Sequence, residues 1–140
     1  MKELGLDPYL IFDIYCKEIR SILELAVPVW QSGLTKKQSK SIESIQRLAF
    51  SIIVGGGESY RRKCQILGAE RLDARRQTIC LTYIRKTAKS GTMSDLIVEN
   101  DKSYNLRPGK HKYREFQCTS KRAFQSPLCT LIRQLNESEA

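Results

Sequence analysis

The chain is poor in the features on which catalysis and membrane insertion depend. Its 140 residues include one histidine and no adjacent pair of aspartates, and 15 acidic residues face 24 lysines and arginines. No apolar run approaches the roughly 20 residues that a transmembrane helix requires. The first residues also lack a basic cap followed by an apolar stretch. We therefore expect no membrane span and no signal peptide, and an intracellular location in the nucleus or cytoplasm.

The five cysteines lack the spacing of a metal site. No two of them are separated by the two to four residues that zinc modules favour. The spacing of His111, Cys118 and Cys129 matches no ordinary zinc module either. We expect free, reduced thiols and neither a metal nor a cofactor.

Catalytic groups are equally scarce. His111 lies between two lysines in a polar stretch, away from any nucleophile that it could activate. The carboxylates are scattered along the chain, whereas an enzyme needs titratable groups that converge in a pocket. We expect no enzymatic activity and no small-molecule substrate.

Positive charge is what the chain has in excess. The formal net charge is +9, which attracts polyanions at long range. Nucleic acid is the polyanion that such a charge favours. The length allows one small core.

Apolar periodicity predicts helices over most of the chain. The first begins at Asp7, which can cap it, and runs to about Leu25, with Pro28 as its stop. The second begins with a capping box formed by Thr35 and Gln38 and ends at the glycines 55–57. Its expected buried stripe consists of Ile42, Ile45, Leu48, Ala49, Ile52 and Ile53. A less favoured alternative leaves part of this stripe as an exposed apolar patch.

Two further helices and a change of pattern complete the prediction. Ser59 caps a short helix that Gly68 closes, and a longer helix follows from Leu72 to about Ala88, with Arg76 on its expected buried stripe. From Glu99 the helical period is lost, and Ser126 with Pro127 restarts a helix. We therefore expect an all-α fold: a helical bundle over residues 1–98, a basic extended arm over 99–125, and a C-terminal helix over 126–140 that docks on the bundle.

Several short segments follow one another along the chain: Ile19-Arg20, Leu23-Glu24, Val27 to Trp30, Leu34-Thr35, Ile45-Gln46-Arg47, Cys64, Leu67-Gly68, Tyr104 to Arg107, Cys118-Thr119, Ser126-Pro127 and Leu131 to Asn136. In this unbroken order they resemble the tails that follow the catalytic domain in non-LTR (LINE-type, jockey-like) retrotransposon reverse transcriptases. The chain departs from the pattern at Leu25, where the family has Tyr, and in the spacing of Lys121-Arg122.

The resemblance implies a non-catalytic fragment of an RNA-directed DNA polymerase. The family's aromatic-x-Asp-Asp hairpin, whose carboxylates hold two metal ions, lies upstream of such a tail and is absent here. The implied partners are RNA or DNA and the missing polymerase domain. The alternative is a stand-alone helical module that binds a protein and has no nucleic-acid role.

The candidate nucleic-acid-binding residues lie mainly in the arm, where aromatic side chains interleave with cations. They are Lys102, Arg107, Lys110, Lys112, Tyr113, Arg114, Lys121 and Arg122. The competing interpretation is a solvated connector whose aromatics only attach it to the bundle. Weaker candidates are Arg61, Arg62, Arg75 and Arg76. These can equally be solubilising residues, and Arg75 can pair with Glu70 or Asp73.

Overall fold

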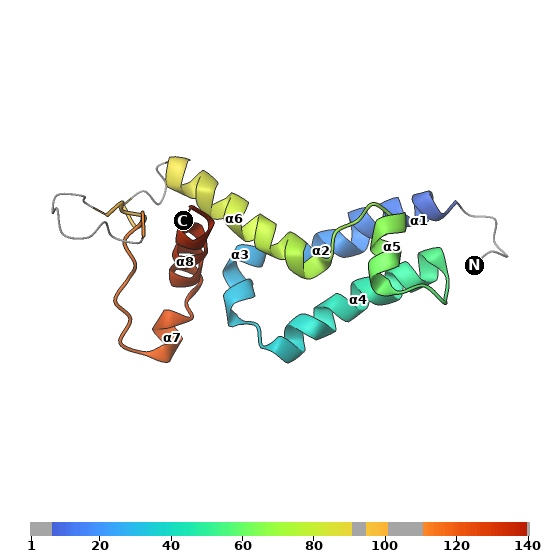
Figure 1. The fold of residues 1–140 in the computed structure, drawn as a ribbon, viewed down its shortest axis with the longest axis horizontal. Coiled ribbons are helices and arrows are strands. Elements are labelled where there is room, and N and C mark those ends of the chain that lie inside the picture. The colour runs from blue at the N-terminus through green and yellow to red at the C-terminus, as the bar shows by residue number, and fades with distance from the viewer. Residues whose placement is uncertain (1–6, 91–94, 101–110, 140) are drawn as a thin grey trace. The chain divides into compact units, whose positions relative to one another are not determined.

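The computed structural model describes residues 7–90, 95–100 and 111–139 (Figure 1). This part of the chain is mainly helical and contains no strand, only one isolated antiparallel bridge between Glu99 and Tyr113. The predicted all-α class is confirmed. The helices are α1 (Pro8–Ile14), η2 (Tyr15–Arg20), α2 (Ser21–Glu24), α3 (Val27–Trp30), η3 (Gln31–Gly33), α4 (Lys36–Val54), α5 (Tyr60–Ile66), α6 (Leu72–Ser90), α7 (Lys121–Phe124) and α8 (Pro127–Glu139).

The chain forms two compact units. Unit 1 comprises residues 1–27 and 34–76, and unit 2 comprises residues 28–33 and 77–140. Each is described by itself below. The predicted boundaries after residues 98 and 125 remain predictions. In the described part of the chain, no helix combines the length and the apolar character needed to cross a bilayer.

The first helical stretch begins and ends close to the predicted bounds, but Pro28 does not stop it. Asp7 caps α1 by accepting a hydrogen bond from the Tyr9 amide. The helix continues to Glu24 in three consecutive segments: α1, the wider π-helical η2, and α2. Ala26 then adopts a left-handed φ of 51°, which ends the helix at a small conformational cost. Pro28 is therefore not the stop. It lies in the first turn of α3, where proline is tolerated because no amide donor is needed there.

Helix α4 has the predicted ends but not the predicted buried face. Thr35 and Gln38 form the capping box, and Gly55 ends the helix with a φ of 97°. The buried residues are Glu43, Gln46, Phe50 and Ile53. Three members of the expected apolar stripe, Ile45, Leu48 and Ile52, are exposed. The predicted buried face was therefore wrong at these three positions. The face of α4 that packs against the core of unit 1 carries polar as well as apolar side chains.

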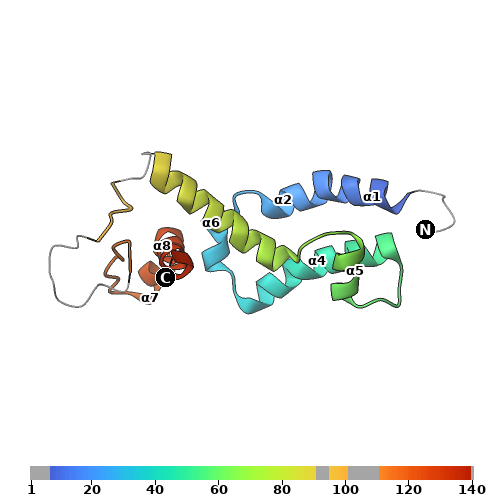
Figure 2. The same ribbon diagram turned by 45° about the horizontal axis from the view of Figure 1, so that its top comes forward.

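Phe50 is the centre of the core of unit 1. It is fully buried, and its ring lies 5.7 Å from that of Tyr15, 5.9 Å from Phe12 and 6.1 Å from Tyr60. Ile53, Cys64 and Leu67 join the same cluster. The aromatic pairs are edge-to-face or tilted, as ring quadrupoles favour. Helices α1, α4 and α5 are thereby held together, and Figures 1 and 2 both show α5 beside α4.

A buried polar network lies beside this cluster. The Tyr15 hydroxyl donates to Gln46 Oε1 at 3.1 Å, and Gln46 Nε2 donates to the Tyr60 hydroxyl at 3.0 Å. Tyr60 donates in turn to Glu43 Oε1 at 2.6 Å. The other oxygen of Glu43 accepts from the Asp73 amide at 2.9 Å, in the first turn of α6. The network satisfies polar groups that would be costly to bury alone.

Unit 2 has an apolar interior and one prominent polar clamp. Its buried apolar residues are Cys80, Ile84, Ile97, Tyr113, Leu131, Ile132 and Leu135. Asn136 of α8, itself buried, accepts from the Tyr113 amide at 2.9 Å and donates to the Tyr113 carbonyl at 3.0 Å. Figure 2 shows α7 beside α8. The clamp fixes the backbone of an otherwise irregular segment against α8.

Candidate nucleic-acid interface

Residues 111–116 of unit 2 form an ordered, strand-like segment. The Asn100 amide donates to the Lys112 carbonyl, and the Arg114 amide donates to the Val98 carbonyl, both at 2.8 Å. These bonds flank Tyr113, which Asn136 holds from the other side. Because successive side chains of an extended segment point to opposite faces, Tyr113 turns inward while Lys112 and Arg114 are exposed.

The described cations of the predicted arm are all at the surface. Lys112, Arg114, Lys121 and Arg122 are exposed. The Lys112 Nζ lies 3.8 Å from a Glu99 carboxylate oxygen and 5.1 Å from the centre of the Tyr113 ring. The other predicted cations, Lys102, Arg107 and Lys110, lie outside the described residues. The described part of the arm therefore presents positive charge on a fixed backbone.

Tyr113 is unsuited to the base-stacking role that was expected for it. Its relative exposure is 9%, and its ring belongs to the interior of unit 2. Here the competing interpretation, an aromatic that attaches the arm to the helices, describes the geometry better. Phe116 remains available, with 45% exposure. Phe124 is exposed as well, but the guanidinium carbon of Arg133 lies 3.7 Å from the centre of its ring.

The weaker candidates in unit 1 fall into two groups. Arg61 and Arg62 are exposed on α5 and can reach a phosphate. Arg75 forms an ion pair with Glu24, not with Glu70 or Asp73 as expected, and this pairing raises the pKa of its guanidinium. Arg76 has 0% exposure, so it cannot contact a phosphate in this structure.

Arg76 instead serves the interior of unit 1. Its Nη2 donates to Ser39 Oγ of α4 at 2.8 Å. Its Nε and Nη1 have no hydrogen-bond partner in the described part of the chain. The sequence pattern had placed Arg76 on the buried stripe of its helix, and burial is what the structure gives it.

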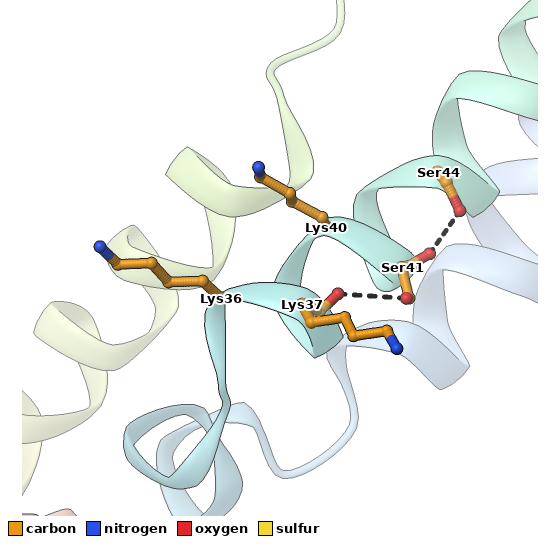
Figure 3. A pocket seen from close by; sticks show the side chains of 5 residues that line it. All are labelled: Lys36, Lys37, Lys40, Ser41 and Ser44. Carbon is orange, nitrogen blue, oxygen red and sulfur yellow. Dashed lines mark hydrogen bonds between the residues drawn. The ribbon is translucent and has the colours of Figure 1, made fainter.

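A lysine cluster at the start of α4 was not predicted as a site. Lys36, Lys37 and Lys40, with Ser41 and Ser44, line a shallow hollow of about 430 Å³. Figure 3 shows the Lys36 and Lys40 side chains extending to one side and Lys37 to the other. Both serine hydroxyls donate to carbonyls of their own helix. The sequence does contain a signal for this cluster, namely lysines in the first turn of a helix. Positive charge is unfavourable there because it opposes the helix dipole.

Apart from the lysines themselves, nothing in the described part of the chain indicates a ligand in that hollow. Its lysines are exposed and diverge, so the cluster adds to the general positive potential of unit 1. Among the described residues there is also no group of three or more histidine, cysteine or acidic side chains placed to hold a metal ion.

The described thiols are free. Cys118 and Cys129 lie close together, with their sulfur atoms 3.5 Å apart. The pKa of Cys118 is raised, first by its hydrogen bond with Cys129 and then by burial.

Comparison with known proteins identifies no relative. Family models, curated proteins and solved structures were all compared with the chain, and none matches it.

Proposed function

We propose that this chain is a non-catalytic module that binds single-stranded RNA or DNA through backbone electrostatics. The observation that carries the proposal is the geometry of residues 111–122. The backbone on either side of Tyr113 is held by the bridge to residues 98–100 and by the Asn136 clamp, and Lys112 and Arg114 are exposed there. Lys121 and Arg122 are exposed on α7.

Cations fixed on a rigid backbone favour a polyanion for a physical reason. Phosphate contacts release condensed counterions, and a preorganised scaffold loses little conformational entropy when it binds. The exposed ring of Phe116 adds a surface on which a base can stack, which is worth about 1–3 kcal/mol per base. A single strand fits this combination because its bases are free to turn outward.

We further propose that the module descends from the tail of a non-LTR retrotransposon reverse transcriptase. The ordered series of short motifs supports this origin. Its role in such a polymerase would be to help hold template RNA or target DNA. The chain by itself would not polymerise, because the paired catalytic aspartates of the family are missing from its sequence.

Binding to a labelled 15-nucleotide single-stranded RNA, measured by fluorescence anisotropy between 25 and 300 mM NaCl, tests the function. We expect the logarithm of the association constant to fall linearly with the logarithm of salt, by roughly 0.7 for each phosphate contact. An absence of binding at 25 mM NaCl would refute the proposed function. Magnesium-dependent nucleotide incorporation by the purified chain would refute its non-catalytic character.

The genomic DNA upstream of Met1 tests the origin separately. We expect an open or decayed reading frame that encodes an aromatic-x-Asp-Asp hairpin. An upstream sequence unrelated to polymerases would remove the support for this ancestry without affecting the binding measurement.

The exposed apolar face of α4 favours protein binding as a second function. Ile45, Leu48 and Ile52 recur at steps of three and four residues, and all are more than 40% exposed. Such a stripe is typical of a helix that packs against a partner. If the double variant Leu48→Ser/Ile52→Ser binds RNA as the unmodified chain does but abolishes a protein complex, this second function gains support.

A further inference from the structure

A cleft in unit 2 combines three cations with an apolar floor. It has a volume of about 410 Å³ and is lined by Arg85, Ala88, Lys89, Ile97, Glu99, Lys112, Tyr113 and Leu135. This volume lies within the range of about 300–1,000 Å³ that is usual for small-ligand sites. The lining carries three positive charges against one negative charge, so an anion is the favoured occupant.

The three cations come from two elements and line one cleft. Arg85 and Lys89 lie one turn apart on α6, and Lys112 lies on the segment that is bridged to residues 98–100. The backbone hydrogen bonds around Tyr113 fix the position of Lys112, and Arg85 Nη2 donates to Ser138 Oγ at 3.2 Å. Two donors from a helix and a third from the segment that lines the cleft with it suit an oxyanion.

The described lining of the cleft carries more positive than negative charge. In the described ranges, neither Arg85 nor Lys89 forms an ion pair. Lys112 pairs with Glu99, the one carboxylate among the described lining residues, at 3.8 Å. The described lining therefore retains a net positive charge that a phosphate can neutralise.

We propose that this cleft is a phosphate-binding subsite for a single nucleic-acid strand, in which Arg85, Lys89 and Lys112 bind one backbone phosphate. The inference rests on the proposed nucleic-acid function and specifies where the strand is held. Arg114, two residues beyond Lys112 on the same exposed side of the segment, extends the path toward the exposed ring of Phe116. A strand that follows this segment would place its next phosphate at Arg114 and a base on Phe116.

The experiment compares two charge-matched double variants of the full chain. Arg85→Gln/Lys89→Gln removes two charges from the cleft. Lys17→Gln/Lys86→Gln removes two exposed charges that do not line it. Binding of the labelled 15-nucleotide RNA is measured across the same salt range, and circular dichroism with the melting temperature confirms that each variant folds.

We expect the cleft variant to lose at least tenfold in affinity at 100 mM NaCl and the control variant to lose no more than threefold. The salt slope of the cleft variant should also fall by roughly 0.7, because one phosphate contact is lost. Equal losses of affinity in the two variants would refute the assignment of the cleft as a phosphate subsite but would not affect the proposed nucleic-acid binding. An unmodified chain that does not bind RNA would overturn both.

A single substitution of the opposite sign gives an independent test. Glu99→Gln removes the only carboxylate of the cleft lining, so RNA affinity should rise about two- to threefold at low salt. Unchanged or weaker binding would contradict the assignment even if the double variant failed to fold.

The two neighbouring thiols carry a second, independent proposal. Cys118 precedes α7, Cys129 lies in the first turn of α8, and their sulfur atoms are 3.5 Å apart. A small movement would bring the two sulfurs to bonding distance of about 2.05 Å.

We infer that Cys118 and Cys129 form a reversible disulfide under oxidation by a low-molecular-weight disulfide such as oxidised glutathione. The thiolate of one cysteine attacks the small disulfide and releases one thiol. The second thiolate then attacks the mixed disulfide, forms the Sγ–Sγ bond and releases the second thiol. The product joins the segment before α7 to α8.

Mass spectrometry of the chain after treatment with oxidised glutathione tests this pair. We expect a loss of two mass units, a cross-linked peptide containing both residues, and a melting temperature higher by several degrees. Cys16→Ser should leave the cross-link intact, and Cys118→Ser should replace it with glutathione on Cys129. A cross-link that involves Cys16 equally, or a stable mixed disulfide in the unmodified chain, would overturn the inference.

Discussion

The two units use their cations in different ways. In unit 1, three basic side chains serve the structure: Arg75 pairs with Glu24, Lys63 donates to Ser51 Oγ at 2.8 Å, and Arg76 donates to Ser39. In unit 2, Lys112 and Arg114 are exposed on a segment whose backbone is held by hydrogen bonds. Positive charge in the sequence is therefore a poor guide to function until burial and pairing are known.

The interiors of the two units also differ in how their buried groups are linked. Unit 1 combines an aromatic cluster with a side-chain network that ends on the Glu43 carboxylate. Unit 2 relies on aliphatic burial and on one side chain, Asn136, that pairs with a backbone. Damage to unit 1 should spread through many partners, whereas damage to the clamp of unit 2 should remain local. The following predictions test that difference.

The largest effect is expected for Phe50→Ala. Loss of a fully buried ring should destabilise unit 1 by about 3–5 kcal/mol, because transfer energy is lost and a cavity remains. Near-ultraviolet circular dichroism and thermal melting measure the loss. Leu48→Ala on the same helix, where the side chain is 64% exposed, is the control and should change stability by less than about 0.5 kcal/mol. Similar losses in both variants would contradict the proposed core.

Asn136→Ala should have the next largest effect. It removes both hydrogen bonds to the Tyr113 backbone and should cost about 2 kcal/mol, with the damage confined to unit 2. Hydrogen exchange should show lost protection at the Tyr113 amide and unchanged protection around Phe50. Asn136→Asp, which keeps the acceptor but places a buried carboxylate oxygen against the Tyr113 carbonyl and Glu115 Oε1, should give at least as large a loss near neutral pH. Full protection of Tyr113 in the alanine variant would disprove the clamp.

Alkaline pH should weaken unit 1 selectively. Burial raises the pKa of the Tyr15 and Tyr60 hydroxyls, and for Tyr60 the bond to Glu43 raises it further. Because the folded pKa exceeds the ordinary value of about 10, this stabilisation is complete below pH 10 and declines as the pH rises beyond it. At pH 11 we expect a loss of about 1 kcal/mol for each tyrosine.

Melting of the chain between pH 8 and pH 11 measures this loss. Tyr15→Phe should be less stable at pH 8 but should show a shallower decline with pH. An unchanged slope in that variant would mean that Tyr15 does not contribute to the pH dependence.

The smallest effect is expected for Glu24→Gln. It removes the carboxylate that pairs with Arg75 and lies 3.7 Å from Arg20. Because the Arg75 side chain is 38% exposed, water screens the pair, and the loss should be about 0.5 kcal/mol and smaller still in 1 M NaCl. Chemical denaturation at two salt concentrations measures it. A loss above about 2 kcal/mol would mean that this pair is a major support of unit 1.

Local signals in the sequence predicted the helix ends well. The Asp7 cap, the Thr35–Gln38 capping box, the Ser59 cap and the stop at Gly55 all occur as expected. Each depends on a hydrogen bond or a backbone angle within a few residues, which neighbouring sequence alone determines. The stop at Pro28 was wrong because Ala26, a residue without a turn signal, takes the left-handed conformation.

The candidate site was only partly predictable. Charge density in residues 102–122 indicated the arm, but the partner of Arg75 lies 51 positions away in the sequence. Arg85 and Lys89 had no distinguishing pattern, because exposed basic residues on a helix are common. Only the fold brings them near Lys112.

By itself the sequence determined the helical class, the main caps and the excess of positive charge, because periodicity, short-range hydrogen bonding and composition are local or additive properties. The tertiary structure alone decided that Glu43 and Gln46 are buried while Ile45 and Leu48 are exposed, and that Arg75 pairs with Glu24. These outcomes depend on which distant groups satisfy a buried polar atom, and that pairing is fixed only when the helices pack together.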